Sequence, residues 1–156
     1  MAALDHLVQR SYAQLLAFDY PPSVLVTALG SLGSVWRVPP RAIDGGMVFV
    51  AEGEGRLLGV AGWSLGAPGG QPGQRGIGHL VHLATDPDRV RRGIGRAVLE
   101  RVCLVAKASG MAGLVCDSTL TAVPFLVAMG FVEEGPLERP LPGGLVFESL
   151  RMRRML

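Results

Sequence analysis

The stretch from residue 77 to residue 109 constrains the fold more than any other part of the chain. An apolar run at residues 77–84 leads into Pro-Asp-Arg-Val-Arg-Arg-Gly-Ile-Gly-Arg at 87–96, and a helical pattern follows at 93–109. We therefore expect a strand that ends in a basic, glycine-containing turn and passes directly into a helix. The short apolar run at 112–118 then predicts a parallel or splayed strand pair in the middle of a sheet.

The turn at 87–96 has the features of an anion-binding site. The first N–H groups of a helix have no partner within it, and the helix dipole places partial positive charge there. Gly93 and Gly95 let an anion approach the backbone closely, and Arg91, Arg92 and Arg96 add formal charge. These features predict a phosphate site, although the glycines could instead relieve crowding at a tight turn.

Hydrophobic periodicity predicts the remaining elements. Helical spacing at residues 4–18 has an end signal in Tyr20-Pro21-Pro22, and Ser23 is a plausible cap for a second helix at 23–32. Loops are expected between Pro39-Pro40 and Gly45-Gly46 and at 66–76. The expected strands lie at 47–51, 57–65, 77–85, 112–118, from 131 onward and at 145–152, and the later helices at 93–109 and 121–129. Hairpin connections imply antiparallel pairing, so the pattern predicts an α+β fold with a splayed, mixed, mostly antiparallel sheet flanked by helices.

Length and composition limit the class of protein. With 156 residues, 49% hydrophobic and 18% charged, the chain is expected to form one domain over residues 1–156. A net charge of +2, with basic residues clustered rather than spread along a face, argues against a nucleic-acid partner. No apolar run reaches the ~20 residues of a membrane span, and the start lacks a signal-peptide pattern. Two cysteines without metal spacing favour a reduced, cytoplasmic protein that binds no metal.

Two segments, in this order, resemble the GNAT superfamily of N-acetyltransferases. The acetyl-CoA loop of that family usually reads Arg or Gln, two residues, Gly, one residue, then Gly or Ala; here the stretch is Val90-Arg91-Arg92-Gly93-Ile94-Gly95. Downstream, Ser118 to Phe125, followed by Gly130-Phe131, is similar to the family's polar residue, alanine, aromatic pair and Gly-Phe. The resemblance covers roughly residues 47–133 well and extends more loosely over the N-terminal helices.

The resemblance implies a splayed sheet with acetyl-CoA wedged into it, and direct acetyl transfer to a primary amine of a small molecule or protein. Strand backbone would pair with the pantetheine amides as an added strand does, turn N–H groups would hold the pyrophosphate, and hydroxyls of the next strand would face the pantetheine arm. The amine would enter from the side of the N-terminal helices and the C-terminal hairpin. The cofactor-binding residues so implied are Leu83, Ala84, Thr85, Arg91, Arg92, Gly93, Ile94, Gly95, Arg96, Ser118 and Thr119.

Three departures from the family pattern matter. Val90 replaces the leading Arg or Gln, so backbone amides and neighbouring arginines, Arg89 included, would hold the anion. Leu126 replaces the tyrosine often assigned as the acid that protonates the departing thiolate. A positioned acid contributes ~10²–10⁴-fold, yet a thiol pKa is about 8.5, so slower catalysis is expected rather than none. Finally, the chain starts at a helix where the family usually has a strand. Either the sheet lacks its first edge strand, leaving a candidate homodimer surface, or the recorded start lies inside the natural one.

The acceptor must lose a proton before it attacks, because an alkyl amine has a pKa of about 10.4. The candidate bases are His82 and Glu52, together with His79, Glu54 and Asp117. His82 shares a strand face with Ala84 if the pairing is regular, and His79 lies on the other face. A purely structural role stays open for both histidines.

Two other functions stay open. A non-catalytic acyl-CoA-binding or regulatory domain on the same fold is the main alternative, and Val90 and Leu126 motivate it. Binding of another phosphate ligand is a weaker one, because the turn is not Gly-x-x-x-x-Gly-Lys-Ser/Thr. Trp36, Trp63 and Tyr20 could line an acceptor pocket or pack in the core.

Overall fold

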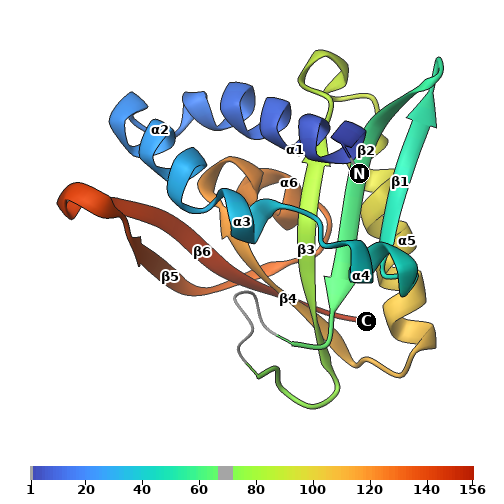
Figure 1. Cartoon of the computed structure of the whole chain (residues 1–156). Coiled ribbons are helices and arrows are strands. Elements are labelled where there is room, and N and C mark those ends of the chain that lie inside the picture. The colour runs from blue at the N-terminus through green and yellow to red at the C-terminus, as the bar shows by residue number, and fades with distance from the viewer. Residues whose placement is uncertain (1, 67–71) are drawn as a thin grey trace.

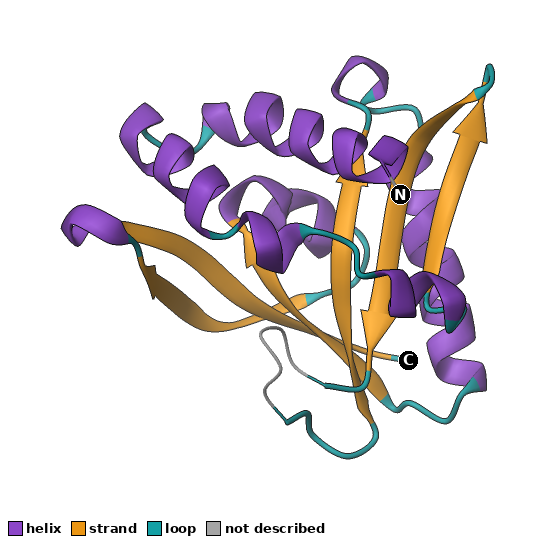
Figure 2. Cartoon of the chain, viewed as in Figure 1, coloured by secondary structure: helices purple, strands orange, loops and turns teal. Residues whose placement is uncertain are grey.

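A single mixed sheet of six strands lies at the centre of the protein, with helices on both of its faces (Figures 1 and 2). The computed structural model describes residues 2–66 and 72–156, apart from the side chains of residues 34 and 35. The strands are β1 (Val48–Gly53), β2 (Arg56–Ser64), β3 (Ile77–Thr85), β4 (Gly113–Thr119), β5 (Val132–Pro140) and β6 (Val146–Met155). They lie in the order β1-β2-β3-β4-β6-β5, and every neighbouring pair is antiparallel except β3–β4. The predicted α+β fold is confirmed.

The helices divide between the two faces of the sheet. They are α1 (Ala2–Leu15), α2 (Pro22–Ser31), α3 (Gly33–Trp36), α4 (Pro40–Asp44), α5 (Ile94–Ala108) and α6 (Val123–Ala128), with short 3-10 turns η1 (Leu16–Phe18), η3 (Pro87–Arg89), η4 (Leu120–Ala122) and η5 (Pro142–Gly144). Val60 of β2 packs with residues of α1, whereas its neighbour Ala61 packs with α5 and α6. Consecutive strand residues point to opposite faces, so α1 and α5 cover opposite sides of the sheet.

Helix α5 shows why the sequence folds in this way. Its buried residues recur at helical spacing and form one apolar stripe: Val98, Leu99, Val102, Cys103 and Ala106. The stripe packs on Trp63 of β2 and Leu80 of β3. The helix ends at a C-cap on Ser109, and Gly110 follows with φ +91, the left-handed conformation that glycine adopts easily.

The structure differs from the sequence-based expectation near two prolines. Ser23 does not cap α2; the helix starts at Pro22, with Pro21 in the N-cap position. The loop expected between Pro39-Pro40 and Gly45-Gly46 contains the short helix α4, which starts at Pro40. Proline suits the first turn of a helix because the N–H it lacks would have no partner there, so both prolines start helices. The expected loop at 66–76 falls partly on residues 67–71, which lie outside the described residues.

Strands β3 and β4 pair over only a short distance and then separate. The register joins Ile77 to Gly113, Gly78 to Leu114 and His79 to Val115, and no further pairs follow. Figure 1 shows the two strands side by side at the bottom of the sheet and diverging toward the top. The edge of β3 that faces β4 is therefore unpaired beyond His79, as the prediction of a splayed central pair required.

Candidate active site

A cavity occupies the gap where β3 and β4 separate. Side chains from both strands, from the N-terminal helices, from α6 and from β5 meet there. The lining residues are Tyr12, Trp36, Leu80, Val81, His82, Leu83, Cys116, Asp117, Ser118, Thr119, Ala122, Leu126 and Arg139. Six of the residues implied or proposed from the sequence are thus brought to one place: Trp36, His82, Leu83, Asp117, Ser118 and Thr119.

A β-bulge at His82 shapes this end of β3. The pairing with β2 passes from Val60↔Ala84 to Gly62↔Val81, so β3 has one extra residue there. His82 itself has φ +58, a left-handed conformation that costs a non-glycine residue roughly 1–3 kcal/mol and is often found at functional sites. The sequence placed His82 and Ala84 on one face of the strand only if the pairing is regular. Because the bulge makes the pairing irregular, that expectation does not hold. A bulge re-aims side chains in this way.

The candidate bases lie in different environments. Burial lowers the pKa of His82, and a hydrogen bond to the backbone of Trp36 opposes that shift. Burial also lowers the pKa of His79, with Asp117 opposing this shift. His79 is the last residue of β3 that pairs with β4, and it lies outside the cavity lining. Glu52 is exposed on edge strand β1, two strands away from the gap, so the structure does not bring it to His82. Asp117 does line the cavity.

The turn before α5 presents free backbone donors. Gly93 is the N-cap with φ +77, and a Cβ there would meet nothing within 4 Å. The first backbone hydrogen bond of the helix runs from the Ala97 N–H to the Gly93 carbonyl, which leaves the N–H groups of the preceding turn, including Ile94, without an acceptor in the helix. Arg91 and Arg92 are exposed beside them. These features fit an anion such as the pyrophosphate of CoA.

The two turn glycines have different roles. A Cβ on Gly95 would lie 3.3 Å from Cζ of Phe125 and 3.5 Å from Cγ2 of Thr85. Gly95 therefore lets α5, α6 and the end of β3 pack closely, which is the crowding role left open from the sequence. Gly93 instead provides the left-handed turn. The contact also joins the two sequence segments that carry the family resemblance.

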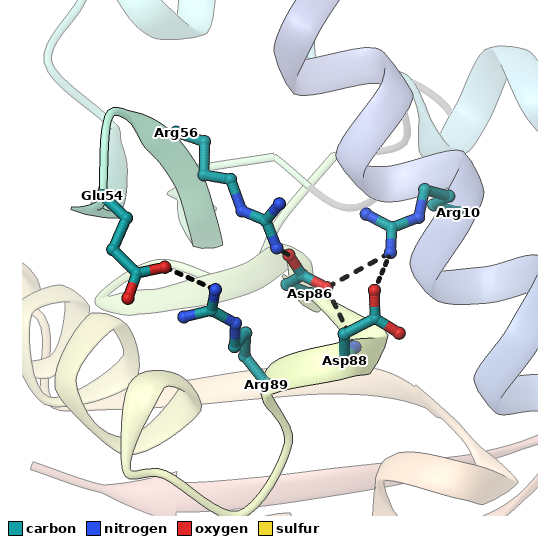
Figure 3. A network of polar contacts seen from close by, with 6 residues as sticks. All are labelled: Arg10, Glu54, Arg56, Asp86, Asp88 and Arg89. Atoms are coloured by element: carbon teal, nitrogen blue, oxygen red, sulfur yellow. Dashed lines mark hydrogen bonds and ion pairs between the residues drawn. The ribbon is translucent and has the colours of Figure 1, made fainter.

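A buried carboxylate organises the start of the turn (Figure 3). Asp86, which is 1% exposed, accepts hydrogen bonds from the Asp88 N–H at 2.9 Å, from Arg56 at 3.1 Å and from Arg10 at 3.4 Å. The Asp88 N–H is the largest cause of the lowered pKa of Asp86, and Arg10 and Arg56 lower it further. The network ties the end of β3 to α1 and to the β1–β2 turn, and so sets where the anion-binding turn begins.

Arg89 belongs to the same neighbourhood but is already paired with a carboxylate. It forms an ion pair with Glu54 in the β1–β2 turn (Figure 3), and this pair lowers the pKa of Glu54. Because Glu54 already neutralises Arg89, Arg91 and Arg92 are the better candidates for the charge that Val90 lacks. The Asp-Pro-Asp sequence at 86–88 is a signal for such a turn, because an aspartate side chain commonly binds the N–H two residues on.

Aromatic side chains close the cavity on the side of the N-terminal helices. Tyr12 and Trp36 meet edge to face at 4.8 Å, Trp36 meets Phe147 at 5.5 Å, and Phe147 stacks on Tyr20 at 4.5 Å. The Tyr12 hydroxyl donates to the Leu83 carbonyl at 3.4 Å, and burial strongly raises its pKa. Through this bond the phenol connects α1 to the bulge of β3.

The two hydroxyl groups of β4 that line the gap already have hydrogen-bond partners. Ser118 donates to the Thr119 carbonyl at 2.7 Å, and the Thr119 hydroxyl accepts from the Ala122 N–H at 3.4 Å. Burial raises the pKa of Cys116 to about 12, so its thiol stays protonated. Leu126 is fully buried against the cavity. The contact of Ser118 and Thr119 with a pantetheine arm stays a prediction.

The other residues implied from the resemblance surround the gap. Leu83 lines it, Ala84 is buried beneath α1, and Thr85 ends β3 beside Gly95. Arg96 is exposed on the first turn of α5 and lies 3.5 Å from Glu100. Of the aromatic residues, Trp36 lines the cavity, whereas Trp63 packs in the core beneath α5.

The family model described as an acetyltransferase (GNAT) domain matches residues 44–133. This match covers more than half of the chain and includes β3, β4, the turn and α5. The chain belongs to the GNAT acetyltransferase family. The resemblance drawn from the two sequence segments is thereby confirmed.

Individual relatives are more distant. The chain is 29% identical over 84 residues to the glucosamine 6-phosphate N-acetyltransferase of Trypanosoma brucei brucei, a match over 54% of this chain and 56% of that protein. The chain therefore spans about half the length of that curated relative.

Solved structures share the fold across the whole chain. A GCN5-related N-acetyltransferase from Rhodopseudomonas palustris matches with a TM-score of 0.74 at 21% identity, over 99% of this chain and 89% of that one. PaiA N-acetyltransferase from Thermoplasma acidophilum, in complex with coenzyme A, matches with a TM-score of 0.69 at 14% identity, over 99% and 92%. Within the described residues, no helix is long and apolar enough to cross a membrane, and no three potential metal ligands cluster.

Proposed function

We propose that this protein is an acetyl-CoA-dependent N-acetyltransferase that transfers the acetyl group directly to a primary amine of a small molecule or protein. The observation that carries the proposal is the gap between β3 and β4, which opens beside the free N–H groups of α5 in a chain of the GNAT family. The CoA-bound neighbour of the same fold supports acetyl-CoA as the donor.

The cofactor would be held mainly by backbone. The N–H groups from Arg91 to Arg96 would bind the pyrophosphate, with the exposed charges of Arg91 and Arg92 beside them. The free edge of β3 at Leu83–Thr85 would pair with the pantetheine amides as an added strand does. The bound thioester supplies the acetyl group and a thiolate leaving group, and the aromatic and aliphatic lining of the gap would keep water from it.

His82 is the base that the geometry supports best. Its lowered pKa keeps the imidazole neutral at physiological pH, ready to take a proton from an ammonium group in the cavity. Burial raises the pKa of both Cys116 and Tyr12, which makes them weak acids toward the thiolate. The thiolate would leave without a dedicated acid, since Leu126 holds the position where the family often has tyrosine.

Calorimetric titration with acetyl-CoA, followed by thiol release across an amine panel, tests the proposal. The name of the curated relative recommends glucosamine 6-phosphate for the panel. Folded protein that shows no binding at tens of micromolar acetyl-CoA would overturn the proposal. Binding without thiol release for any amine would favour the alternative, a non-catalytic acyl-CoA-binding domain. Turnover that His82→Gln abolishes would exclude that alternative.

Self-association remains a second, separate prediction. Strand β1 ends the sheet among the described residues, so pairing of two β1 edges would build a homodimer. Light scattering at several protein concentrations tests it.

A further inference from the structure

Three charged residues from three strands meet on the face of the sheet that the N-terminal helices cover. Asp117 of β4 pairs in register with Arg151 of β6, so their side chains share a face. Arg139 of β5 pairs with Phe147, which packs against α2. Arg139 therefore lies on that face too and reaches across β6 toward Asp117. Asp117 and Arg139 both line the cavity.

This cluster has more positive than negative charge. Nε of Arg151 lies 3.3 Å from Oδ1 of Asp117, which is a hydrogen bond. Nη2 of Arg139 lies 3.8 Å from Oδ2, too far for one. Among the described residues Arg139 has no other ion pair. Two guanidinium groups thus share one carboxylate, and the planar fork of Arg139 keeps its donors for another anion.

Nearby carboxylates do not balance this charge. Glu134 is paired with Arg153 at 3.0 Å. Glu138 pairs with Glu148, and this pair is adjacent to the Arg139–Phe147 pair. Because consecutive strand residues point to opposite faces, both glutamates lie on the other face of the sheet.

Buried polar atoms without partners mark the same face. The Oγ of Ser149 and the Nδ1 of His79 are buried and find no hydrogen-bond partner in the described part of the chain. Ser149 lies two residues from Arg151 on β6, and His79 pairs with Val115, two residues from Asp117. A Cβ on Gly135, which pairs with Arg151, would meet nothing within 4 Å. Buried polar groups without partners on the same face as the arginines are consistent with a site for a polar ligand.

We propose that the acceptor amine carries an anionic group, a phosphate or a carboxylate, and that Arg139 and Arg151 bind it. The amine then reaches His82 at the gap, and the carbon part of the acceptor lies against Tyr12 and Trp36, which line the same cavity. The inference rests on the proposed function and adds the class of acceptor to it. A bidentate arginine contact gives such an acceptor orientation as well as affinity.

Matched pairs of amines test the inference. Glucosamine 6-phosphate against glucosamine isolates a phosphate, and phenylalanine against 2-phenylethylamine isolates a carboxylate. Each is titrated calorimetrically into the CoA-loaded protein, and kcat and KM for acetyl transfer are measured in parallel. We expect the anionic member of at least one pair to bind about tenfold or more tightly, and the pair that shows this identifies the anion. Equal or weaker binding of the anionic member in both pairs, or no binding of any probe at millimolar concentration, would overturn the inference.

Variants locate the anion. Arg139→Gln should raise KM for the anionic amine about tenfold to a hundredfold, with kcat and the KM for acetyl-CoA nearly unchanged. Arg139→Lys should restore part of the loss by returning charge without the fork. Arg153→Gln, on the same face of β6 but paired with Glu134, is the matched control and should change none of these values. Equal effects of Arg139→Gln and Arg153→Gln would contradict the inference, and if Arg139→Gln fails to fold, the wild-type pairs and Arg139→Lys decide. Failure of acetyl-CoA binding would refute the proposed function. Turnover of only those amines that lack an anionic group would refute the inference and leave the proposed function standing.

Discussion

Replacing Asp86 by asparagine should destabilise the protein far more than the same change at Asp88. Both carboxylates bind Arg10, Asp88 at 2.6 Å and Asp86 at 3.4 Å. Their side chains differ in exposure, 2% for Asp86 against 62% for Asp88. If only the distance to Arg10 mattered, Asp88 would contribute more to stability than Asp86. Comparing the two variants therefore separates the effect of burial from the effect of contact distance.

The magnitude follows from what each variant leaves behind. Removing one partner of a fully buried ion pair costs about 3–5 kcal/mol. The Arg10 and Arg56 side chains are 31% and 49% exposed and regain water when they lose Asp86, while asparagine can still accept from the Asp88 N–H. We therefore expect Asp86→Asn to lower the free energy of unfolding by about 2–3 kcal/mol. Asp88→Asn breaks an exposed pair and should cost less than about 1 kcal/mol.

Urea unfolding at pH 7 measures both variants, with an unchanged m-value as the check on two-state behaviour. The pH dependence supplies a second reading. The folded pKa of Asp86 is lowered, so its contribution is complete above the unfolded value of about 3.9 and is lost as the pH falls through the folded pKa. The difference between wild type and Asp86→Asn should stay constant from about pH 5 to 8 and shrink below about pH 4. Equal losses for the two variants, or a difference that grows in acid, would refute the reasoning.

Three further predictions concern the cofactor turn and the bulge. Gly93→Ala should cost about 1–2 kcal/mol of stability at φ +77 and weaken acetyl-CoA binding, whereas Gly110→Ala, with φ +91 at the other end of α5, should cost as much stability and leave calorimetric binding unchanged. Because burial lowers the pKa of His82, kcat/KM should stay level as the pH falls to about 6.5 and decline only below that value. A decline that begins above about pH 6.5 would contradict His82 as the base. The variant His82→Gln should lower kcat about 10²–10⁴-fold. Tyr12→Phe removes the hydroxyl that donates to the Leu83 carbonyl, so the free energy of unfolding should fall by about 1–2 kcal/mol. The variant should also lower kcat without changing the pH dependence of kcat/KM. A pH dependence that shifts in this variant would indicate proton transfer by Tyr12.

Local sequence signals predicted the elements well where periodicity and glycine positions agree. The run at 77–85 became β3 with the same bounds, and the stripe on α5 required its helix. Prolines misled the prediction, because Pro22 and Pro40 start helices where a cap and a loop were expected. A proline in the sequence indicates only that a preceding helix or strand ends. The proline itself fits a turn or the first residue of a new helix equally well.

The candidate site was predictable only in part, for a physical reason. The anion turn is local, so Gly93 and its neighbours could be found from spacing. The bulge at His82 inserts one residue into β3, and no signal in a single strand reveals the register of its partner. The Asp117–Arg139–Arg151 cluster joins three strands that are distant in sequence, so it appears only once the sheet order is known.

Amide hydrogen exchange with and without acetyl-CoA tests the central claim most directly, that backbone at the end of β3 and the start of α5 holds the cofactor. In the free protein, the N–H groups of the turn before Ala97 lack acceptors in the helix and should exchange fast. With saturating acetyl-CoA, exchange should slow in Arg91–Arg96 and along the free edge of β3 at Leu83–Thr85, and stay unchanged at the β1–β2 turn. Protection that leaves Arg91–Arg96 unaffected, in protein shown to bind acetyl-CoA, would contradict the account.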